Sequence, residues 1–260
     1  MSSVFDVPTG TKQGGILSPD FFSMYMHDLI KKLKDSGYGT YVIQQCISCI
    51  FFADDIVLLS PSRHGLQKLL DICVEYCKKF CLDFNVKKSK VMIVGKSSGD
   101  VCALKLNGVP LEYVSEYKYL GVRLRASPGL SFSATETIRS FYRAANSIFH
   151  SPVKLSNDVL MKLLYANCVP ILTYGCAVKE FCASDMHKCH VAVNNAIRKI
   201  FSFAVWQSIR HLRQSLGYDS IYEIFAKAKM KFLASAVHSS IVIIQHLAMN
   251  CDNLSCSSLE

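Results

Sequence analysis

The sequence has no apolar run long enough to cross a lipid bilayer, which would need roughly 18 uncharged apolar residues. The nearest candidate, residues 233–249, contains His238, His246 and serines, and we expect a buried amphipathic helix there. Its first residues contain no basic region leading into an apolar segment, so no secretory signal is expected. Internal repeats are absent, and the only low-complexity segment is the serine-bearing C-terminus.

The composition describes a folded, cationic protein. Hydrophobic residues make up 50% of the 260 positions and charged residues 19%, which excludes a disordered chain and suits one large or two small domains. Twelve cysteines without the spacing of a small disulfide scaffold indicate reduced thiols in an intracellular protein, nuclear or cytoplasmic. The net charge is +9, of which +3 falls in residues 1–124 and +6 in residues 125–260. A polyanionic partner is therefore expected, mainly for the second half.

Helix and strand signals alternate in the first half. A helix should start at Ser18, with serine as its cap and Pro19 in its first turn, and end at about Ser36 before Gly37 and Gly39.

Residues 40–60, rich in β-branched and aromatic side chains, predict two strands joined at Asp54 and Asp55. Residues 63–83 have a helical apolar period. Short strands are expected at KVMIVG, ALKLNGVPL and SEYKYLGVRL, with Asn107 and Gly108 forming a two-residue hairpin turn.

The pattern changes after the turn signal at residues 127–129. Long helices are predicted at residues 131–149, 156–176, 184–203 and 218–248. The fold class is therefore α+β, with an antiparallel sheet and packed helices followed by an all-helical region.

Asp54 and Asp55 are the most informative residues, because they lie between apolar stretches that otherwise predict buried strands. Burying two adjacent carboxylates is costly unless a cation compensates their charge. Successive side chains of a strand point to opposite faces, so the pair can serve one site only at a tight turn. An exposed acidic turn on a solvated hairpin is the alternative.

Four motifs in this order resemble the reverse transcriptases, and within them those of non-LTR, LINE-like retrotransposons. The motifs are GTKQGGILSPDFF (residues 10–22), FADD (52–55), LDFNVKKSKVMIVG (82–95) and EYKYLGVRL (116–124). The resemblance is firm over residues 4–124 and weaker in the helical region, where LLYANCVPILTYGCAV resembles the family's thumb. It divides the chain into a partial right-hand polymerase palm, residues 1–126, and a helical thumb and downstream region, residues 127–260.

The resemblance also implies the roles of individual residues. It gives magnesium, with manganese as the alternative ion, bound at Asp54 and Asp55, with Asp54 the principal ligand. Lys88 would lie near the triphosphate, unless it is an ordinary solvated lysine of the KKSK run. The nucleotide and template contacts would be Gln13, Gly14, Gly15, Ser18 and Phe52. The primer grip would be Tyr119, Leu120 and Gly121.

The resemblance implies RNA-templated addition of deoxynucleotides to a DNA primer, with RNA template, DNA primer and deoxynucleoside triphosphates as partners and no membrane. The family's palm also holds another metal-binding Asp, upstream of the Gln-Gly motif, and fingers before it. The residues on either side of Asp6 do not match those around the family's upstream Asp. We therefore expect this chain to lack the fingers and that ligand, and to be inactive alone. The rivals are a non-catalytic relic that binds nucleic acid, and an intron-encoded or telomerase-like reverse transcriptase.

Other signals favour structural roles. Cys46 and Cys49, like the cysteines at 73, 77 and 81, are expected to be core thiols. The cluster of Cys182, His187, Cys189 and His190 should diverge around a helix start rather than bind a metal. Trp206, Tyr218 and Tyr222 are predicted to be core residues, with base stacking as the alternative. A template-tracking face, against an ordinary solvated surface, is the interpretation for the basic residues Arg139, Arg143, Lys154, Lys162, Arg198, Lys199, Arg210, Arg213, Lys227, Lys229 and Lys231.

Overall fold

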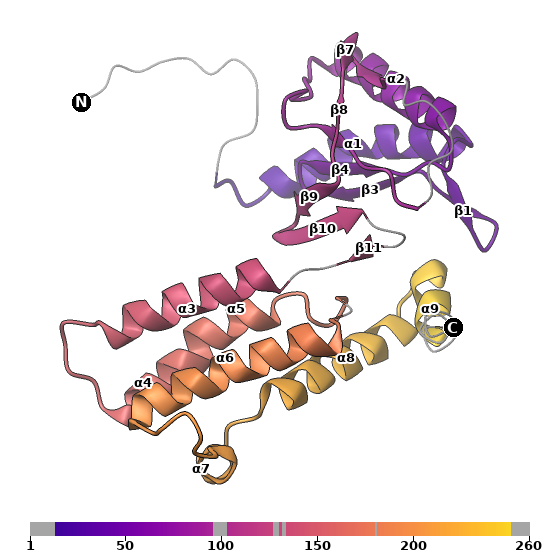
Figure 1. Cartoon of the computed structure of the whole chain (residues 1–260). Coiled ribbons are helices and arrows are strands. Elements are labelled where there is room, and N and C mark those ends of the chain that lie inside the picture. The colour runs from indigo at the N-terminus through magenta and orange to yellow at the C-terminus, as the bar shows by residue number, and fades with distance from the viewer. Residues whose placement is uncertain (1–13, 96–102, 127–129, 132–133, 180, 251–260) are drawn as a thin grey trace, which may run out of the picture. The chain divides into compact units, whose positions relative to one another are not determined.

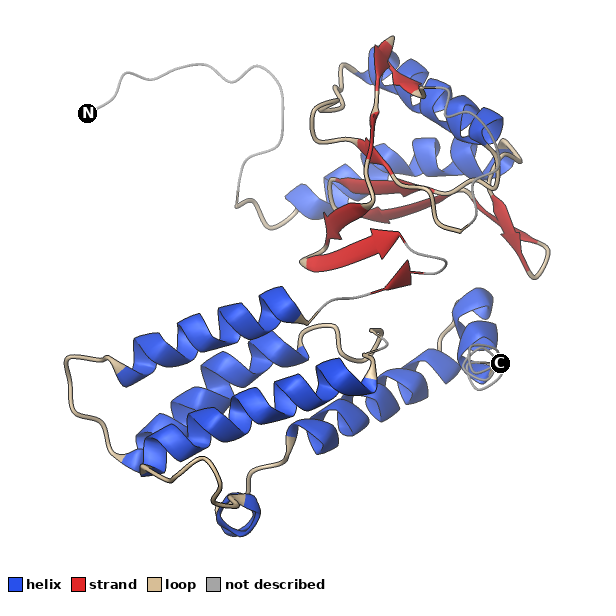
Figure 2. Ribbon diagram, in the orientation of Figure 1, coloured by secondary structure: helices blue, strands red, loops and turns tan. Residues whose placement is uncertain are grey.

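The computed structural model describes residues 14–95, 103–126, 130–131, 134–179 and 181–250. The chain divides into two compact units, which Figure 1 colours from indigo to yellow along the sequence. The first comprises residues 1–91 and 98–114, and the second residues 92–97 and 115–260. Strands and helices are mixed in the first unit, whereas helices dominate the second (Figure 2). The α+β class is confirmed in this form, while the assignment of palm and thumb stays a prediction.

The first unit contains two long helices and short strands. Its elements are α1 (Ser18–Asp35), β1 (Thr40–Val42), β2 (Gln45–Ile47), β3 (Cys49–Phe52), β4 (Asp55–Leu58), α2 (Arg63–Phe80), β5 (Lys90–Val91), β6 (Lys105–Leu106), β7 (Val109–Pro110) and β8 (Glu112–Tyr113). The strands pair two by two: β1 with β2, β3 with β4 and β6 with β7 antiparallel, and β5 with β8 parallel.

Two apolar clusters hold the first unit together. One joins α1 to α2 and β3, with Leu29, Leu69 and Tyr76 fully or almost fully buried. The Tyr76 hydroxyl donates to the Tyr25 carbonyl, and the Tyr25 hydroxyl donates to the Phe80 carbonyl at 2.7 Å, which ties the two helices together. The other cluster packs a neighbouring stripe of α2 against the later strands; its buried members are Leu70, Val91, Leu104, Leu106 and Leu111.

The start of α1 differs from the prediction. Ser18 is the first helical residue rather than the cap; Leu17 occupies the cap position, and no side chain caps the helix. Proline does lie in the first turn, as expected, because its missing N–H costs nothing there. At the other end, Gly37 adopts a positive φ of 72°, in keeping with its predicted role.

Residues 40–60 form two hairpins rather than the two strands predicted. The first hairpin turns at Ile43 and Gln44, which both adopt positive φ although neither is glycine or asparagine. The sequence carries no turn signal at that point, which explains why the hairpin was not foreseen. The predicted Asn107–Gly108 turn is confirmed: both residues have positive φ, and they join β6 to β7.

The second unit begins with strands and continues in helices. Its elements are β9 (Glu116–Tyr119), β10 (Val122–Ala126), β11 (Leu130–Ser131), α3 (Thr135–Phe149), α4 (Asn157–Leu163), a π-helical turn η1 (Leu164–Cys168), α5 (Val169–Thr173), α6 (Ala183–Phe201), α7 (Arg210–Ser215), α8 (Ile221–Val237) and α9 (Val242–Met249). The three strands form an antiparallel sheet in the order β11-β10-β9. Within the described part of the chain, no helix is long and apolar enough to span a membrane.

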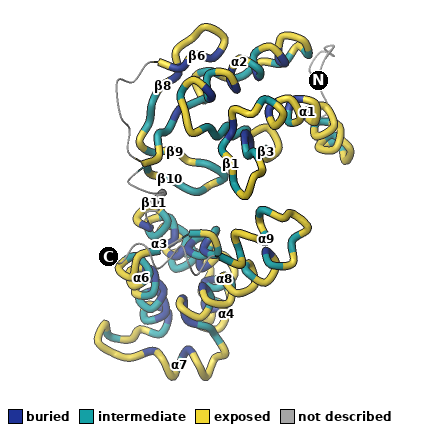
Figure 3. Tube along the Cα trace, turned by 90° about the vertical axis from the view of Figure 1, so that its right-hand side faces the viewer, coloured by how far each residue is buried: buried dark blue, intermediate teal, exposed yellow. Residues whose placement is uncertain are grey.

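A single apolar cluster forms the core of the second unit. It takes residues from α3, the α4–η1–α5 segment, α6 and the start of α8, including Phe141, Leu164, Leu172 and Ile197, which are fully buried. Figure 3 shows the inward faces of these helices as buried and their outward faces as exposed. Amphipathic helices of this kind are stabilised mainly by such packing.

The helix predicted over residues 156–176 is interrupted by a π turn. Pro170 lacks an N–H and cannot continue a regular α ladder. Immediately before it, the Val169 amide donates to the Leu164 carbonyl, five residues back. Helix formation thus continues across the proline with one extra residue in a turn.

The helix predicted over residues 218–248 is in fact two helices, α8 and α9. At the break, the Ser239 hydroxyl accepts a hydrogen bond from the Ile241 amide at 3.1 Å. Serine side chains compete in this way with the helical ladder, so a helix can end without glycine or proline. The short helix α7 was also not predicted, because its six residues are mostly polar.

Candidate functional site

Asp54 and Asp55 lie at the end of the β3–β4 hairpin. Phe52 pairs with Asp55, and Ala53 and Asp54 form the turn between them. Ala53 adopts a positive φ of 50°. The predicted tight turn at the carboxylate pair is therefore present, with Asp55 already in the strand.

The two faces of this hairpin differ. Cys49, Phe51, Ile56 and Leu58 pack against the apolar cluster of α1 and α2. Side chains of a strand alternate, so Phe52 and its partner Asp55 belong to the opposite face. That face is open: the Phe52 side chain is 61% exposed. The hairpin is thus held by its inner face and presents an aromatic ring and a carboxylate outward.

Both carboxylates are exposed rather than buried. Their geometry alone matches the acidic-turn alternative, because no burial here demands a compensating cation. Among the residues that the structure describes, no group of three His, Cys, Asp or Glu side chains could hold a metal ion. The pair therefore supplies two carboxylate groups, whose oxygens suit Mg²⁺. Phosphate, water or another carboxylate would have to complete the coordination shell of the ion.

The residues that resemble the nucleotide-binding loop lie before and at the start of α1. Gly14 has a positive φ of 79°, and a Cβ atom added there would meet no atom within 4 Å. The Ser18 amide donates to the Gly15 carbonyl at 3.2 Å, which closes the turn that leads into the helix. Gln13 lies outside the described residues.

Lys88 is presented by a turn that Asn85 builds. The Asn85 side chain accepts a hydrogen bond from the Lys88 amide at 3.1 Å, and its carbonyl accepts from the Ser89 hydroxyl at 3.0 Å. Asparagine is suited to this because its side chain can imitate a backbone turn. The lysine side chain is exposed. The Asn-x-x-Lys-Ser motif is thus a local structural unit with the lysine at its surface.

Tyr119, Leu120 and Gly121 form the end of the β9–β10 hairpin in the second unit. Leu120 and Gly121 make a two-residue turn with φ of 46° and 77°. The Tyr174 hydroxyl donates to the Leu120 carbonyl at 2.9 Å. A Cβ atom on Gly121 would lie 3.2 Å from the Tyr174 ring, so both the backbone and this close contact favour glycine.

A pocket of about 450 Å³ lies beside this hairpin and includes two residues that the sequence did not single out. Tyr174 and Lys179 line it together with Lys118, Gly121 and Arg123. The Lys179 ammonium donates to the Tyr174 carbonyl at 2.8 Å and lies over the Tyr174 ring. Burial lowers the pKa of Lys179. In the sequence, Tyr174 belongs to the segment LLYANCVPILTYGCAV that resembles the family's thumb, and nothing in the sequence indicated Lys179.

The cationic side chains around this pocket differ in whether they already form ion pairs. Arg123 forms ion pairs with Glu136 at 2.9 Å and with Glu116 at 3.3 Å. Lys118, on the same hairpin, is exposed. Lys118 and Lys179 therefore provide the cationic groups that a polyanion reaching this hairpin would meet.

The cysteines behave as core residues, as predicted for most of them. Burial raises the pKa of Cys73 to about 12 and that of Cys189 to about 11, so both stay protonated thiols at neutral pH. Cys81 was also predicted to be a core thiol, but it is exposed and ends α2 in a left-handed conformation. The Cys182 sulfur accepts from the Asp185 amide at 3.4 Å, a helix cap.

Trp206 was predicted to be in the core and is instead 87% exposed, in the loop before α7. Tyr218 does pack, with its ring 4.3 Å from that of Tyr165. Among the basic residues, Lys162 and Lys227 pair with Asp158 and Asp219, and Arg213 is buried. The template-tracking face stays a prediction, with Arg213 as a member that is not at the surface.

Comparison with known proteins agrees with these motifs. Residues 3–124 match the family described as "Reverse transcriptase (RNA-dependent DNA polymerase)". The RNA-directed DNA polymerase from mobile element jockey of Drosophila funebris is 28% identical over 243 residues, 89% of this chain and 26% of the relative.

Two further relatives come from other elements. The Pol polyprotein from type-1 retrotransposable element R2 of Popillia japonica is 25% identical, covering 76% of this chain and 33% of the relative. That of the type-2 element R2DM of Drosophila melanogaster is 32% identical, covering 53% of this chain and 14% of the relative. The chain thus spans about a third or less of the curated relatives it matches. Residues 3–124 thus match the reverse transcriptase family, and the chain is similar over most of its length to RNA-directed DNA polymerases of mobile elements.

Proposed function

We propose that this chain is part of an RNA-directed DNA polymerase that adds deoxynucleotides to a primer 3′ hydroxyl on an RNA template. The observation that carries the proposal is the Asp54–Asp55 pair at the open end of a hairpin whose inner face is anchored in a core. The match of residues 3–124 to the reverse transcriptase family favours this role for the pair over an ordinary acidic turn. The partners would be an RNA template, a DNA primer and deoxynucleoside triphosphates.

Asp54 and Asp55 would hold divalent metal, magnesium or manganese, through their carboxylate oxygens. When bound, two such ions organise the attacking hydroxyl and the leaving pyrophosphate. The described residues offer this carboxylate pair and no third ligand nearby. Catalysis would therefore need a further oxygen ligand beyond this pair, and we propose that the chain alone is inactive because no described residue supplies it.

The surrounding residues would bind and orient the nucleotide. Phe52, on the same face as Asp55, offers an exposed ring to the nucleotide or template. Gly14 leaves room for close approach of the backbone, and Gln13 would press on the nascent base pair. Lys88, presented by the Asn85 turn, would neutralise phosphate charge.

The second unit would hold the primer through its β9–β10 hairpin, which would belong to the palm, and the duplex through its helices, which would form the thumb. Tyr119, Leu120 and Gly121 would form the primer grip, with the turn kept in shape by the Tyr174 hydrogen bond. Lys118 and Lys179 would bind the primer backbone beside it. This assigns the palm to residues 1–126 and the thumb and downstream region to residues 127–260.

Primer extension on an RNA template with Mg²⁺ tests the proposal. We expect no extension by this chain alone and extension by a longer chain that adds upstream polymerase sequence. In that longer chain, Asp54→Asn removes a metal ligand worth several kcal/mol, so the rate should fall at least about a hundredfold. Asp83→Asn, which removes one exposed charge in the same unit, is the matched control and should leave the rate unchanged.

A rival function is nucleic-acid binding without catalysis, favoured by the exposure of both carboxylates and by the net charge of +9. It predicts that Asp54→Asn and Asp83→Asn bind template-primer equally and that the longer chain never extends the primer. Extension that is insensitive to Asp54→Asn would refute the metal-binding role of the hairpin.

A further inference from the structure

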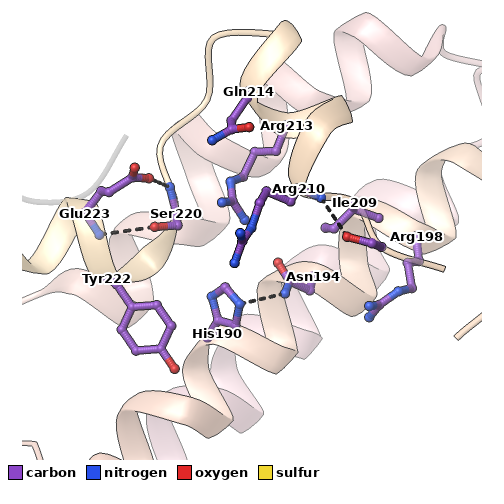
Figure 4. A pocket seen from close by; sticks show the side chains of 11 residues that line it. His190, Asn194, Arg198, Ile209, Arg210, Arg213, Gln214, Ser220, Tyr222 and Glu223 are labelled. Atoms are coloured by element: carbon purple, nitrogen blue, oxygen red, sulfur yellow. Dashed lines mark hydrogen bonds between the residues drawn. The ribbon is translucent and has the colours of Figure 1, made fainter. Parts of the chain in front are cut away.

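A second pocket, of about 400 Å³, lies within the second unit between α6, α7 and the start of α8. Figure 4 shows the side chains that surround it, with the guanidinium groups of Arg210 and Arg213 directed towards its centre near His190. Arg198 lines the same pocket. Three arginines therefore line one cavity that none of the polymerase motifs includes, and two of them point into it.

Arg213 is the residue that requires explanation. Its side chain is 7% exposed, and its Nε atom is buried without a hydrogen-bond partner among the described residues. Buried charged groups are normally paired, because removing an ion from water costs several kcal/mol. A buried, unpartnered guanidinium nitrogen in a cavity wall indicates that a ligand with acceptor oxygens completes its interactions.

The other two arginines of the lining differ in how they are held. Arg198 is held by hydrogen bonds to the Gln207 carbonyl at 3.0 Å and to the Asn195 side chain at 2.9 Å. Arg210 is exposed at the mouth, on the short helix α7. The cavity wall thus contains the buried guanidinium group of Arg213, that of Arg198 held by hydrogen bonds, and that of Arg210 exposed to solvent.

The remaining polar groups leave the positive charge uncancelled. Glu223 is the single acidic residue of the lining, and its carboxylate accepts the Ser220 amide at 2.5 Å in the capping box of α8. His190 accepts from the Asn194 side chain at 2.9 Å, and burial together with the nearby Arg213 lowers its pKa, which keeps it neutral. The lining is therefore net cationic near neutral pH.

We propose that this cavity is a phosphate-binding site, in which Arg198, Arg210 and Arg213 together bind the oxygens of one terminal phosphoryl group. Guanidinium groups suit this ligand because their planar forks match phosphate oxygens. The group would come either from a nucleic-acid end or from free phosphate. The site lies outside the primer grip and the carboxylate hairpin, so it does not depend on polymerase activity.

Calorimetric titration of the full chain tests the site with three probes: inorganic phosphate, a 5′-phosphorylated oligonucleotide, and the same oligonucleotide without its phosphate. We expect saturable binding of phosphate or a clear preference for the phosphorylated oligonucleotide. Preference for the oligonucleotide identifies a nucleic-acid end as the source, and equal affinity for inorganic phosphate identifies the free ion. No phosphate binding, together with no preference between the two oligonucleotides, would overturn the proposal.

Variants separate this site from general electrostatic attraction. Arg210→Gln, on an exposed position, should weaken phosphate binding about tenfold, the effect of one charged hydrogen bond. Arg213→Met, which keeps an unbranched apolar stem but removes the guanidinium group, should abolish binding. Lys68→Gln, which removes an exposed charge of α2 in the first unit, is the matched control and should bind like the parent. Equal loss in Lys68→Gln and Arg210→Gln would mean non-specific attraction and refute the site.

Discussion

The two units differ in how their cores support the residues on their surfaces. In the first, two apolar clusters use adjacent stripes of α2, and the strands pair only two by two. In the second, one continuous cluster joins all the helices from α3 to the start of α8. The carboxylates accordingly lie on a short hairpin positioned by side-chain packing, while the cationic pocket is lined by helices with a shared core.

The chain thus holds these polar side chains in two ways, by apolar packing beneath them and by hydrogen bonds to them. A two-stranded hairpin is at best marginally stable by itself, so β3–β4 depends on Phe51, Ile56 and their helical neighbours. In the pocket, Arg198 depends instead on hydrogen bonds to a backbone carbonyl and a side chain within the helical unit. Loss of packing should therefore disturb each unit separately.

The largest effect is expected from Phe141→Ala, which empties the centre of the continuous cluster. Removing this fully buried ring should cost about 3–5 kcal/mol of unfolding free energy. Amide hydrogen exchange should then rise throughout α3 to α8 and stay unchanged in α2. Leu70→Ala, in the smaller cluster, is the counterpart and should raise exchange in α2 and the strands packed on it while leaving α3 to α8 unchanged. A similar rise across both units in either variant would break the comparison.

Alkaline pH should weaken the second unit through its buried thiols. Burial raises the pKa of Cys189 from 9.0 to about 11, so the folded state holds this proton more tightly than the unfolded state. The resulting stability is complete below pH 9 and is lost as pH rises towards 11, by about 2 kcal/mol. Urea unfolding at pH 8 and at pH 11 should show a smaller loss for Cys189→Ala than for the parent chain. Equal losses would remove Cys189 as the cause.

Two glycines at equivalent turn positions sharpen the comparison further. Gly108 and Gly121 share a positive φ, but a Cβ at Gly108 meets nothing within 4 Å, whereas one at Gly121 lies 3.2 Å from Tyr174. Each alanine substitution should cost about 1 kcal/mol for the backbone alone. Thermal unfolding should therefore show a larger loss for Gly121→Ala. In a Tyr174→Ala background, which lacks the ring, Gly121→Ala should cost no more than Gly108→Ala does in the parent chain. A larger cost in that background would refute this account.

The smallest effects come from the helix starts. The Ser220 hydroxyl accepts from the Glu223 amide at 3.2 Å, so Ser220→Ala should cost about 1 kcal/mol. The Ser62 hydroxyl accepts from the Gly65 amide at 3.1 Å at the start of α2, but Ser62 is exposed, so water can replace it and Ser62→Ala should cost less. Chemical denaturation of the two variants measures the difference. An equal loss at both positions would show that the burial of Ser220 adds nothing to its cap.

The sequence predicted those parts of the fold that local chemistry determines. The helix over residues 63–80, the Asn107–Gly108 turn and the carboxylate turn all carry strong short-range signals, and all three are present. The Ile43–Gln44 turn and the break between α8 and α9 carry none, because non-glycine residues adopt the required backbone there.

The candidate site was only partly accessible from the sequence. Family motifs identified Asp54 and Gly121, whose roles stay predictions. Tyr174 and Lys179 reach the Gly121 hairpin from more than fifty positions away, and Arg213 joins Arg198 only through the packing of α7 on α6. Contacts of this kind depend on tertiary structure, which periodicity and motifs do not encode. The exposure of Trp206 was missed for the same reason.

The π turn before Pro170 sets the rotational phase of everything that follows it in the helix. One extra residue in a turn rotates the next residues by about 100° relative to an uninterrupted α-helix. Tyr174, four residues beyond the proline, reaches Leu120 only in this phase. Converting the π turn to α geometry at unchanged chain length would turn the tyrosine away from the hairpin, whereas deleting one residue within 164–168 along with that conversion would keep its direction. In this segment, the number of residues and the type of helical turn are therefore matched to each other.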